Sequence, residues 1–318
     1  MLAILLVTFP FFALVLCGYV AARGGWLPHA AIPGLNAFVL YFALPCMLYR
    51  FGSSTPVAQF ADPALIVTYF LCAVAMVALT VGASYRRVGW NDGAFGALVA
   101  TFSNTGYMGV PLLVALLGAG AAGPAIVTIL IDLLFTSSAC IALSRLDSAG
   151  THGAAIAARH ALRGVVVNPM PWAIVLGALS SALGLTLWGP IGQTIGLLAD
   201  AASPAALFTI GAVLARSRAT PREAGARNAR DEIPLALAKL ILHPLLVYGA
   251  GRLAIAAGAS LSAFTLTVMT LVAALPSASN VVMLAERFGA DSGRIARIIL
   301  ISTTLAFLTF SAAVALLT

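Results

Sequence analysis

The sequence predicts an all-α polytopic membrane protein with ten transmembrane helices, arranged as two inverted five-helix repeats in which helices 4 and 9 are broken. Three observations lead to this fold class: an apolar composition, ten hydrophobic runs, and an interruption at the centre of two runs. Of the 318 residues, 61% are hydrophobic and 8% are charged, whereas soluble domains carry about 25% charged residues. The net charge of +7 reflects loop arginines. The sequence has no basic stripe interleaved with aromatic residues, so no nucleic-acid partner is expected.

The hydrophobic runs have the length of membrane-spanning helices, which need about 20 apolar residues. The first run lacks the basic n-region of a cleaved signal peptide, so we expect it to remain as a membrane helix. The ten runs cover residues 2–22, 31–50, 62–84, 93–118, 124–144, 166–184, 190–215, 232–254, 262–287 and 294–317.

Charges are distributed unevenly between the loops on the two sides of these runs. Arg50 and Arg252 lie on the side of the termini, and the other fourteen arginines lie on the opposite side. Cytoplasmic loops carry the excess of basic residues in membrane proteins. Both termini are therefore predicted to be non-cytoplasmic.

Two runs are interrupted near their centres, by Ser-Asn-Thr-Gly-Tyr-Met-Gly-Val-Pro at 103–111 and by Pro-Ser-Ala-Ser-Asn at 276–280. Pro111 has no N–H and crowds the carbonyl of Tyr107, so a regular helix cannot continue there. An unpaired backbone group in hydrocarbon costs several kcal/mol, so irregular backbone is expected only inside protein or beside a water-filled cavity. Broken helices at corresponding places in two halves indicate a transporter's binding site.

The chain divides into a first five-helix repeat at 1–147, a cytoplasmic linker at 148–165 and a second repeat at 166–318. Pro45 in the second run corresponds to Pro204 in the seventh, and the broken runs are the fourth and the ninth. Because five is an odd number of spans, the second repeat enters the membrane with the opposite orientation, as in many secondary transporters.

The two interruptions supply the candidate substrate-binding residues. The ends of half-helices carry partial charges that suit carboxylates or cations, and amide side chains add donors and acceptors without a buried full charge. The alternative for the asparagines is that they only cap the breaks, and for Tyr107 that it packs. The candidates are Asn104, Thr105, Gly106, Tyr107, Pro111, Pro276, Ser277, Ser279 and Asn280.

Three ionisable residues inside the runs are candidates for a coupling-ion or proton site: Asp132, Lys239 and His243. Ionisable side chains within membrane spans usually serve a pathway. A structural hydrogen bond to a neighbouring helix is the alternative for Asp132, and snorkelling to the surface is the alternative for Lys239. His243 lies four residues after Lys239, on the same helix face, and could relay a proton or pack as a neutral ring.

Four segments together resemble the auxin efflux carrier (AEC) family: Leu44-Pro45, residues 102–111, residues 203–211 and residues 275–280. The resemblance covers essentially the whole chain. It implies a scaffold of helices 1, 2, 6 and 7, a moving transport unit of helices 3–5 and 8–10, and a crossover at Asn104 and Asn280. The family includes plant auxin exporters and bacterial permeases described as malonate or malate transporters. Without the long cytoplasmic loop of the large plant exporters, this chain is closer to the bacterial members, which implies a bacterial-type inner membrane.

These features predict a secondary transporter or facilitator for a small organic anion of the malonate or malate type, or an auxin-like one, with an elevator or rocking mechanism of alternating access. The alternative is a cation/proton antiporter of the same architecture, although its crossover would need carboxylates. A non-transporting receptor would not need strained backbone in both halves. No catalytic or metal motif stands in a fitting context, so no enzyme, metal or cofactor is predicted. The expected partners are the anion, H+ or Na+, and the lipid bilayer, and small-residue runs permit a homodimer.

Overall fold

The computed structural model describes residues 2–56, 60, 62–146, 166, 169–219 and 231–318. Within these ranges, seven helices are long and apolar enough to cross a membrane, and three shorter apolar helices accompany them at Thr105–Leu117, Pro169–Ala182 and Ala263–Ala274. The described residues therefore have the fold of a helical, polytopic membrane protein, as predicted. The linker predicted at 148–165 lies outside the described residues.

The helices group into two compact units, each built from both halves of the chain. The first unit comprises Met1–Pro63, Thr105–Val127 and Asn168–Ala219. It contains α1 (Leu2–Arg23), η1 (His29–Ala31), α2 (Ile32–Phe38), η2 (Val39–Ala43), α3 (Leu44–Ser54), η4 (Thr105–Gly109), α5 (Val110–Leu117), η5 (Ala119–Ala121), α9 (Pro169–Ala182) and α10 (Gly189–Ala219).

The second unit comprises Ala64–Asn104, Thr128–Val167 and Thr220–Thr318. It contains α4 (Pro63–Thr101), η6 (Asp132–Thr136), α7 (Ser137–Leu143), α11 (Glu232–Leu237), η8 (Ala238–Leu242), α12 (His243–Ala256), α13 (Ala263–Ala274), α14 (Val281–Arg287) and α15 (Ser292–Leu317). The helix α6 (Ala122–Ile131) contributes to both units.

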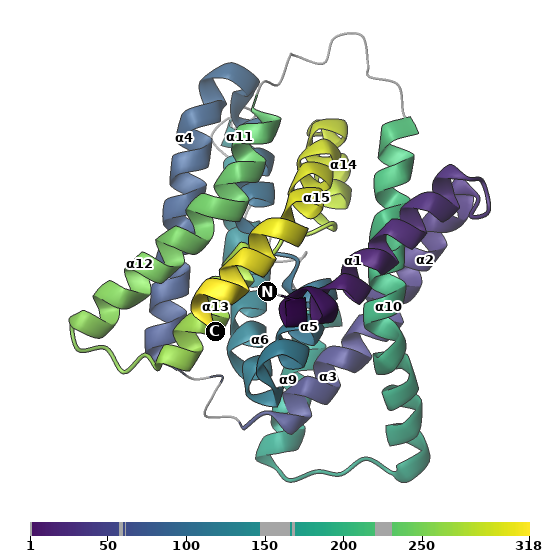
Figure 1. The fold of residues 1–318 in the computed structure, drawn as a ribbon, viewed down its shortest axis with the longest axis vertical. Coiled ribbons are helices and arrows are strands. Elements are labelled where there is room, and N and C mark those ends of the chain that lie inside the picture. The colour runs from purple at the N-terminus through teal and green to yellow at the C-terminus, as the bar shows by residue number, and fades with distance from the viewer. Residues whose placement is uncertain (1, 57–59, 61, 147–165, 167–168, 220–230) are drawn as a thin grey trace. The chain divides into compact units, whose positions relative to one another are not determined.

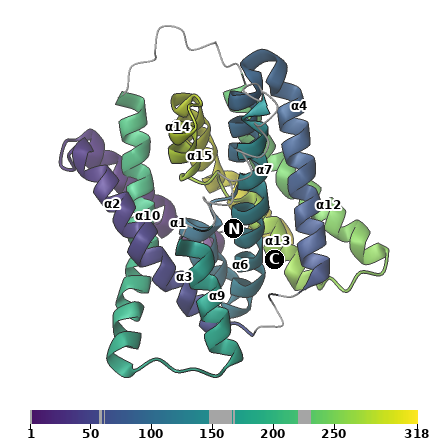
Figure 2. The same cartoon turned by 180° about the vertical axis from the view of Figure 1, so that it is seen from behind.

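Glycines bring two helix pairs of the first unit into close contact, α1 with α10 and α3 with α9 (Figures 1 and 2). A Cβ atom added to Gly18 on α1 or to Gly211 on α10 would lie 1.9 Å from a backbone oxygen of the facing helix. A Cβ atom added to Gly177 on α9 would lie 2.5 Å from the carbonyl oxygen of Tyr49 on α3. Small residues that let helix backbones approach are the usual basis of helix association in membranes.

Within the described ranges, four helices contain a five-residue π-helical segment, and prolines account for three of these segments. The segments η2, η4 and η8 each end two residues before a proline, at Pro45, Pro111 and Pro244. A proline lacks an N–H and crowds the carbonyl four residues before it, so a wider turn relieves the clash. In η6, Ser137 donates from its hydroxyl to the backbone carbonyl of Asp132 at 2.9 Å. Such π-bulges are frequent at functional sites.

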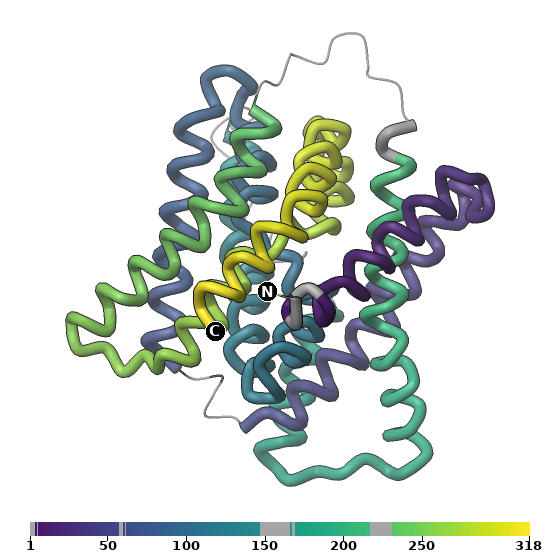
Figure 3. Tube along the Cα trace, viewed as in Figure 1, coloured from purple at the N-terminus to yellow at the C-terminus, as the bar shows by residue number. Residues whose placement is uncertain are grey.

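The chain of the second unit is interrupted at 102–104 and 275–280. The first interruption is shorter than the predicted 103–111, because the π-helical turn of η4 carries the helix on through Pro111. Gly89, with φ of +84°, divides α4 into two arms, which correspond to the predicted third span and the first half of the fourth (Figure 3). The second arm ends at Thr101, and η4 begins only at Thr105. Likewise α13 ends at Ala274, and α14 begins at Val281. The backbone groups freed at these two gaps need partners within the protein.

Candidate functional site

The two interruptions meet within the second unit as an antiparallel β-bridge between Ser103 and Ser277. The backbone N–H of Asn104 donates to the carbonyl of Pro276 at 2.9 Å, and the reciprocal bond across the bridge measures 3.0 Å. Each gap therefore satisfies backbone groups of the other, which is how irregular backbone is tolerated at membrane depth.

Several polar side-chain atoms at this bridge are buried without a hydrogen-bond partner among the described residues: Oδ1 of Asn104, Oδ1 of Asn280 and Oγ of Ser277. Asn280 occupies the N-cap position of α14, yet its side chain makes no capping hydrogen bond. Capping therefore does not explain Asn280. Buried polar groups are normally paired, so this cluster indicates a place for a ligand or water.

The remaining predicted substrate residues divide between the two units. Ser279 is half-buried beside the bridge in the second unit. Thr105, Gly106 and Tyr107 form the start of η4, and Pro111 lies in α5, all within the first unit. The side chain of Tyr107 is buried.

Lys239 lies within the second unit and is fully buried, so the interpretation that it snorkels to the surface is wrong. Its ammonium donates to Oγ of Ser103 at 2.7 Å and to the carbonyl of Ala273 at 2.7 Å. Ala273 belongs to the last turn of α13, whose free carbonyls form the negative end of the helix dipole. The cation therefore bonds both to the first interruption and to the helix end that precedes the second.

Asp132 is the first residue of η6 and is fully buried. Tyr69 and Thr136 donate hydroxyl hydrogen bonds to its carboxyl at 3.3 and 3.1 Å, and the backbone N–H of Ser103 is a further donor. Asp132 also interacts electrostatically with Lys239. Ser103 thus contacts both charged residues, the acid through its backbone and the base through its hydroxyl.

His243 completes this buried group. Its Nδ1 lies 3.1 Å from Nζ of Lys239, and its ring centroid lies 6.0 Å from that of Tyr69. Beside an ammonium, Nδ1 must accept the hydrogen bond, which leaves the proton of a neutral imidazole on Nε2. That Nε2 is buried without a hydrogen-bond partner among the described residues.

Sequence reasoning did not identify two members of this group. Ser103 and Tyr69 carry no charge, and nothing in the sequence places Tyr69 opposite Asp132 across the unit. The π-bulges that hold Lys239 and Asp132 could be anticipated only for Lys239, from Pro244.

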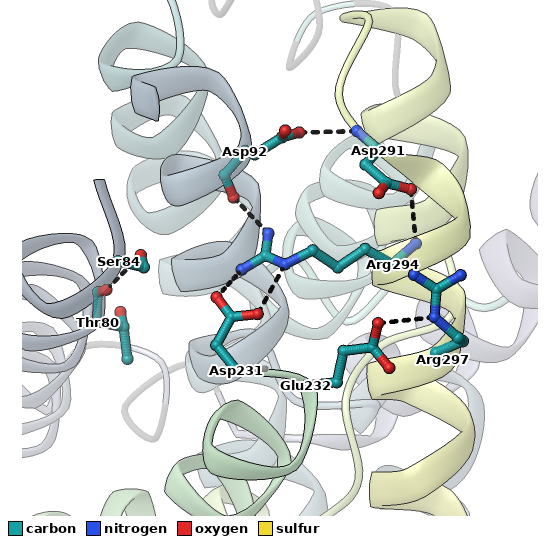
Figure 4. Close-up of polar contacts among 8 residues, drawn as sticks. All are labelled: Thr80, Ser84, Asp92, Asp231, Glu232, Asp291, Arg294 and Arg297. Atoms are coloured by element: carbon teal, nitrogen blue, oxygen red, sulfur yellow. Dashed lines mark hydrogen bonds and ion pairs between the residues drawn. The ribbon is translucent and has the colours of Figure 1, made fainter. Parts of the chain in front are cut away.

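A second polar network also escaped prediction, because the arginines near residue 294 look like ordinary loop charges. Arg294 is 2% exposed and forms a bidentate ion pair with Asp231, with contacts of 3.1 and 2.5 Å (Figure 4). It also donates to the backbone carbonyl of Asp92 at 2.8 Å. Arg297 pairs with Glu232 at 2.7 Å. The network joins α4, α11 and α15 at one end of the second unit.

Comparison with known proteins decides which class of membrane protein this geometry belongs to. A family model described as "Membrane transport protein" matches residues 3–148 and 154–314. The chain belongs to this family, the auxin efflux carriers. The resemblance found from the sequence is therefore confirmed.

Named members of the membrane transport protein family align along most of this chain. A protein of Rhizobium meliloti (strain 1021) named "Putative malonate transporter" is 30% identical over 308 residues, which cover 94% of this chain and 91% of the relative. The "Uncharacterized transporter YfdV" of Escherichia coli (strain K12) is 26% identical over 283 residues, or 88% of this chain and 86% of the relative. This chain is accordingly an integral membrane transporter rather than an enzyme.

Proposed function

We propose that this transporter moves a small organic anion with one or two carboxylates, malonate being the first candidate, through a site at the paired interruptions. The β-bridge, with two buried amide oxygens and one buried hydroxyl that have no hydrogen-bond partner among the described residues, is the observation that carries the proposal. The name of the relative from Rhizobium meliloti supplies the candidate substrate.

The chemistry of the bridge suits reversible binding of a carboxylate. Asn104, Ser277, Ser279 and Asn280 offer amide and hydroxyl groups that can turn to donate hydrogen bonds. Neutral donors hold an anion without a fixed ion pair, so release costs less than it would from a buried salt bridge. Thr105, Gly106, Tyr107 and Pro111 remain predicted contacts.

The group around Asp132 and Lys239 is proposed as the coupling site. Its charges touch Ser103, so a proton gained or lost there acts directly on one strand of the bridge. A hydroxyl and a helix C-terminal carbonyl are ligands of the kind that broken helices offer to sodium, and here the ammonium of Lys239 already holds both. This arrangement favours H+ over Na+ as the coupling ion, with His243 as a proton relay.

The proposal includes two inverted five-helix repeats, with helices 1, 2, 6 and 7 as the scaffold and helices 3–5 and 8–10 as the moving unit. The two glycine contacts of the first unit support the repeat, because exchanging the halves converts the α1–α10 pair into the α9–α3 pair. The placement of both termini outside the cytoplasm rests on the arginine distribution.

One observation favours the alternative of a cation/proton antiporter. Such an antiporter needs a carboxylate at the crossover, and Asp132 lies beside it, since its carboxyl accepts a hydrogen bond from Ser103 in the bridge. The two functions differ in whether ion movement requires an organic anion.

Proteoliposomes with a pH-sensitive dye inside distinguish these functions. We expect labelled malonate uptake that is stimulated by an inward proton gradient and is unaffected by replacing Na+ with K+. Proton movement without any carboxylate would establish the antiporter instead. Uptake that follows a sodium gradient would contradict the proposed coupling ion.

A further inference from the structure

An elongated apolar groove of about 770 Å³ runs along the second unit between α4 and α7, separate from the bridge. Small side chains leave this space open: Ala73, Ala78 and Gly82 on α4 face Ala139 and Ala142 on α7. Val74 and Phe135 on its walls are about half exposed, so the groove opens to the outside of the unit. Its volume is within the range of ligand-binding pockets, roughly 300–1,000 Å³.

Aromatic pairs mark the two ends of the groove. Phe70 and Phe135 make an edge contact at one end, with ring centroids 5.3 Å apart, and Tyr85 and Trp90 pack at 4.9 Å at the other. From Phe70 to Tyr85 the helix rises about 22 Å at 1.5 Å per residue. One leaflet contributes about half of a hydrocarbon core of roughly 30 Å. The groove is therefore longer than one leaflet's share of the core, so one lipid acyl chain fits along it, and tyrosine and tryptophan are the residues typical of the level at which the headgroups begin.

Two arginines stand at the Tyr85 end. Arg86 is exposed, and its Nε donates to the Tyr85 hydroxyl at 3.0 Å, which ties the guanidinium to a wall of the groove. Arg87 is its exposed neighbour. No carboxylate pairs with either arginine among the described residues. Among the described residues, therefore, no acidic side chain neutralises this positive charge, and an anionic partner would complement it.

We infer that this groove binds an anionic phospholipid, with an acyl chain lying between α4 and α7 and the headgroup phosphate held by Arg86 and Arg87. An apolar slot that ends in two arginines, neither paired with a carboxylate in the part of the chain that the structure describes, complements a molecule with a long hydrocarbon chain and an anionic head. Guanidinium groups bind phosphate oxygens well, and each basic residue near a membrane surface attracts anionic lipid. The lipid would stay with the protein when the bulk bilayer is removed.

Native mass spectrometry of the full chain tests this inference. The protein is reconstituted in nanodiscs of phosphatidylglycerol and phosphatidylcholine, released into detergent, and its retained lipids are counted. The wild type should keep phosphatidylglycerol in preference to phosphatidylcholine. Arg86→Gln should reduce that preference about fivefold, as expected for the loss of one interfacial cation, whereas Arg86→Lys should largely keep it. Ala139→Phe, which fills the groove, should abolish retention.

Arg252→Gln is the matched control. Arg252 is also exposed and also bonds to a tyrosine on its own helix, Tyr248 on α12. It lies outside the groove. An equal effect of Arg252→Gln and Arg86→Gln would overturn the inference, and so would equal retention of the two lipids by the wild type. Phosphatidylglycerol with a photoreactive acyl chain should label peptides of α4 or α7. Labelling confined to other helices would also overturn it.

Discussion

The ammonium of Lys239 donates a hydrogen bond of 2.7 Å to the hydroxyl of Ser103, the residue at which the first broken helix pairs with the second. The backbone N–H of the same serine points to Asp132. A change of charge on Lys239 or on Asp132 therefore acts directly on Ser103, and through Ser103 on the first interruption. This relationship joins the proposed coupling group to the proposed substrate site.

Removing the cation alone should destabilise the protein. We expect Lys239→Met to lower the free energy of unfolding by about 3–5 kcal/mol, because it leaves the Asp132 carboxylate buried without its counter-charge. The double variant Lys239→Met/Asp132→Asn should recover a large part of this loss, since neither buried charge remains. Denaturant unfolding of the four proteins of this cycle measures the coupling. Strictly additive losses would show that the two charges do not interact.

Asp132→Asn should separate coupling from transport. An asparagine keeps the size of the side chain but cannot exchange a proton in the physiological range. We therefore expect malonate–malonate exchange to persist while uptake driven by a proton gradient disappears. Tyr69→Phe, which removes only one hydrogen bond to Asp132, should have a smaller effect. Undiminished gradient-driven uptake by Asp132→Asn would remove Asp132 from the coupling site.

The helix contacts of the first unit depend on glycine. Gly211→Ala should lower the unfolding temperature markedly, because the new Cβ atom would lie 1.9 Å from the carbonyl oxygen of Val15. Gly196→Ala is the control on the same helix, since no heavy atom lies within 4 Å of the added Cβ atom. It should be neutral or slightly stabilising, as alanine favours helix over glycine by about 1 kcal/mol. Similar unfolding temperatures for the two variants would contradict the close packing of α1 on α10.

Sequence reasoning found the regions of both interruptions, but local chemistry explains only the second, where Pro276 lies in the gap. The first gap, at 102–104, contains neither glycine nor proline, and Gly106 and Pro111 lie within the helix formed by η4 and α5, so these residues do not break it. The regions in which the two gaps lie could nevertheless be expected. The partners of Lys239 could not, because they depend on which helix faces which. A lysine that snorkels to the surface and a lysine that is buried look the same in a sequence, and only the contacts in the folded protein distinguish them. Arg294 was misjudged for the same reason, since its partner Asp231 is 63 positions away.

The ion pair of Arg294 should contribute far more than an exposed one. We expect Arg294→Ala to cost about 3–5 kcal/mol, because the Asp231 carboxylate would be left buried and unpaired. Arg50 and Asp200 form the comparison pair at 2.6 Å, with side chains 42% and 68% exposed. Arg50→Ala should cost about 1 kcal/mol or less. Equal losses of unfolding free energy would show that burial does not set the strength of the Arg294 pair.

The most direct test of the central claim is the thermal unfolding of purified wild type, Asn104→Ala and Asn280→Ala with increasing malonate, with Asp200→Asn as a surface control. A ligand at a hundred times its Kd stabilises the folded state by about 2.7 kcal/mol. The account predicts that malonate raises the unfolding temperature of the wild type and of Asp200→Asn but not of either asparagine variant. Both asparagine variants should unfold near the wild-type temperature without malonate, because they lose an amide oxygen that has no hydrogen-bond partner. Equal stabilisation of Asn104→Ala and the wild type by malonate would contradict a substrate site at the paired interruptions.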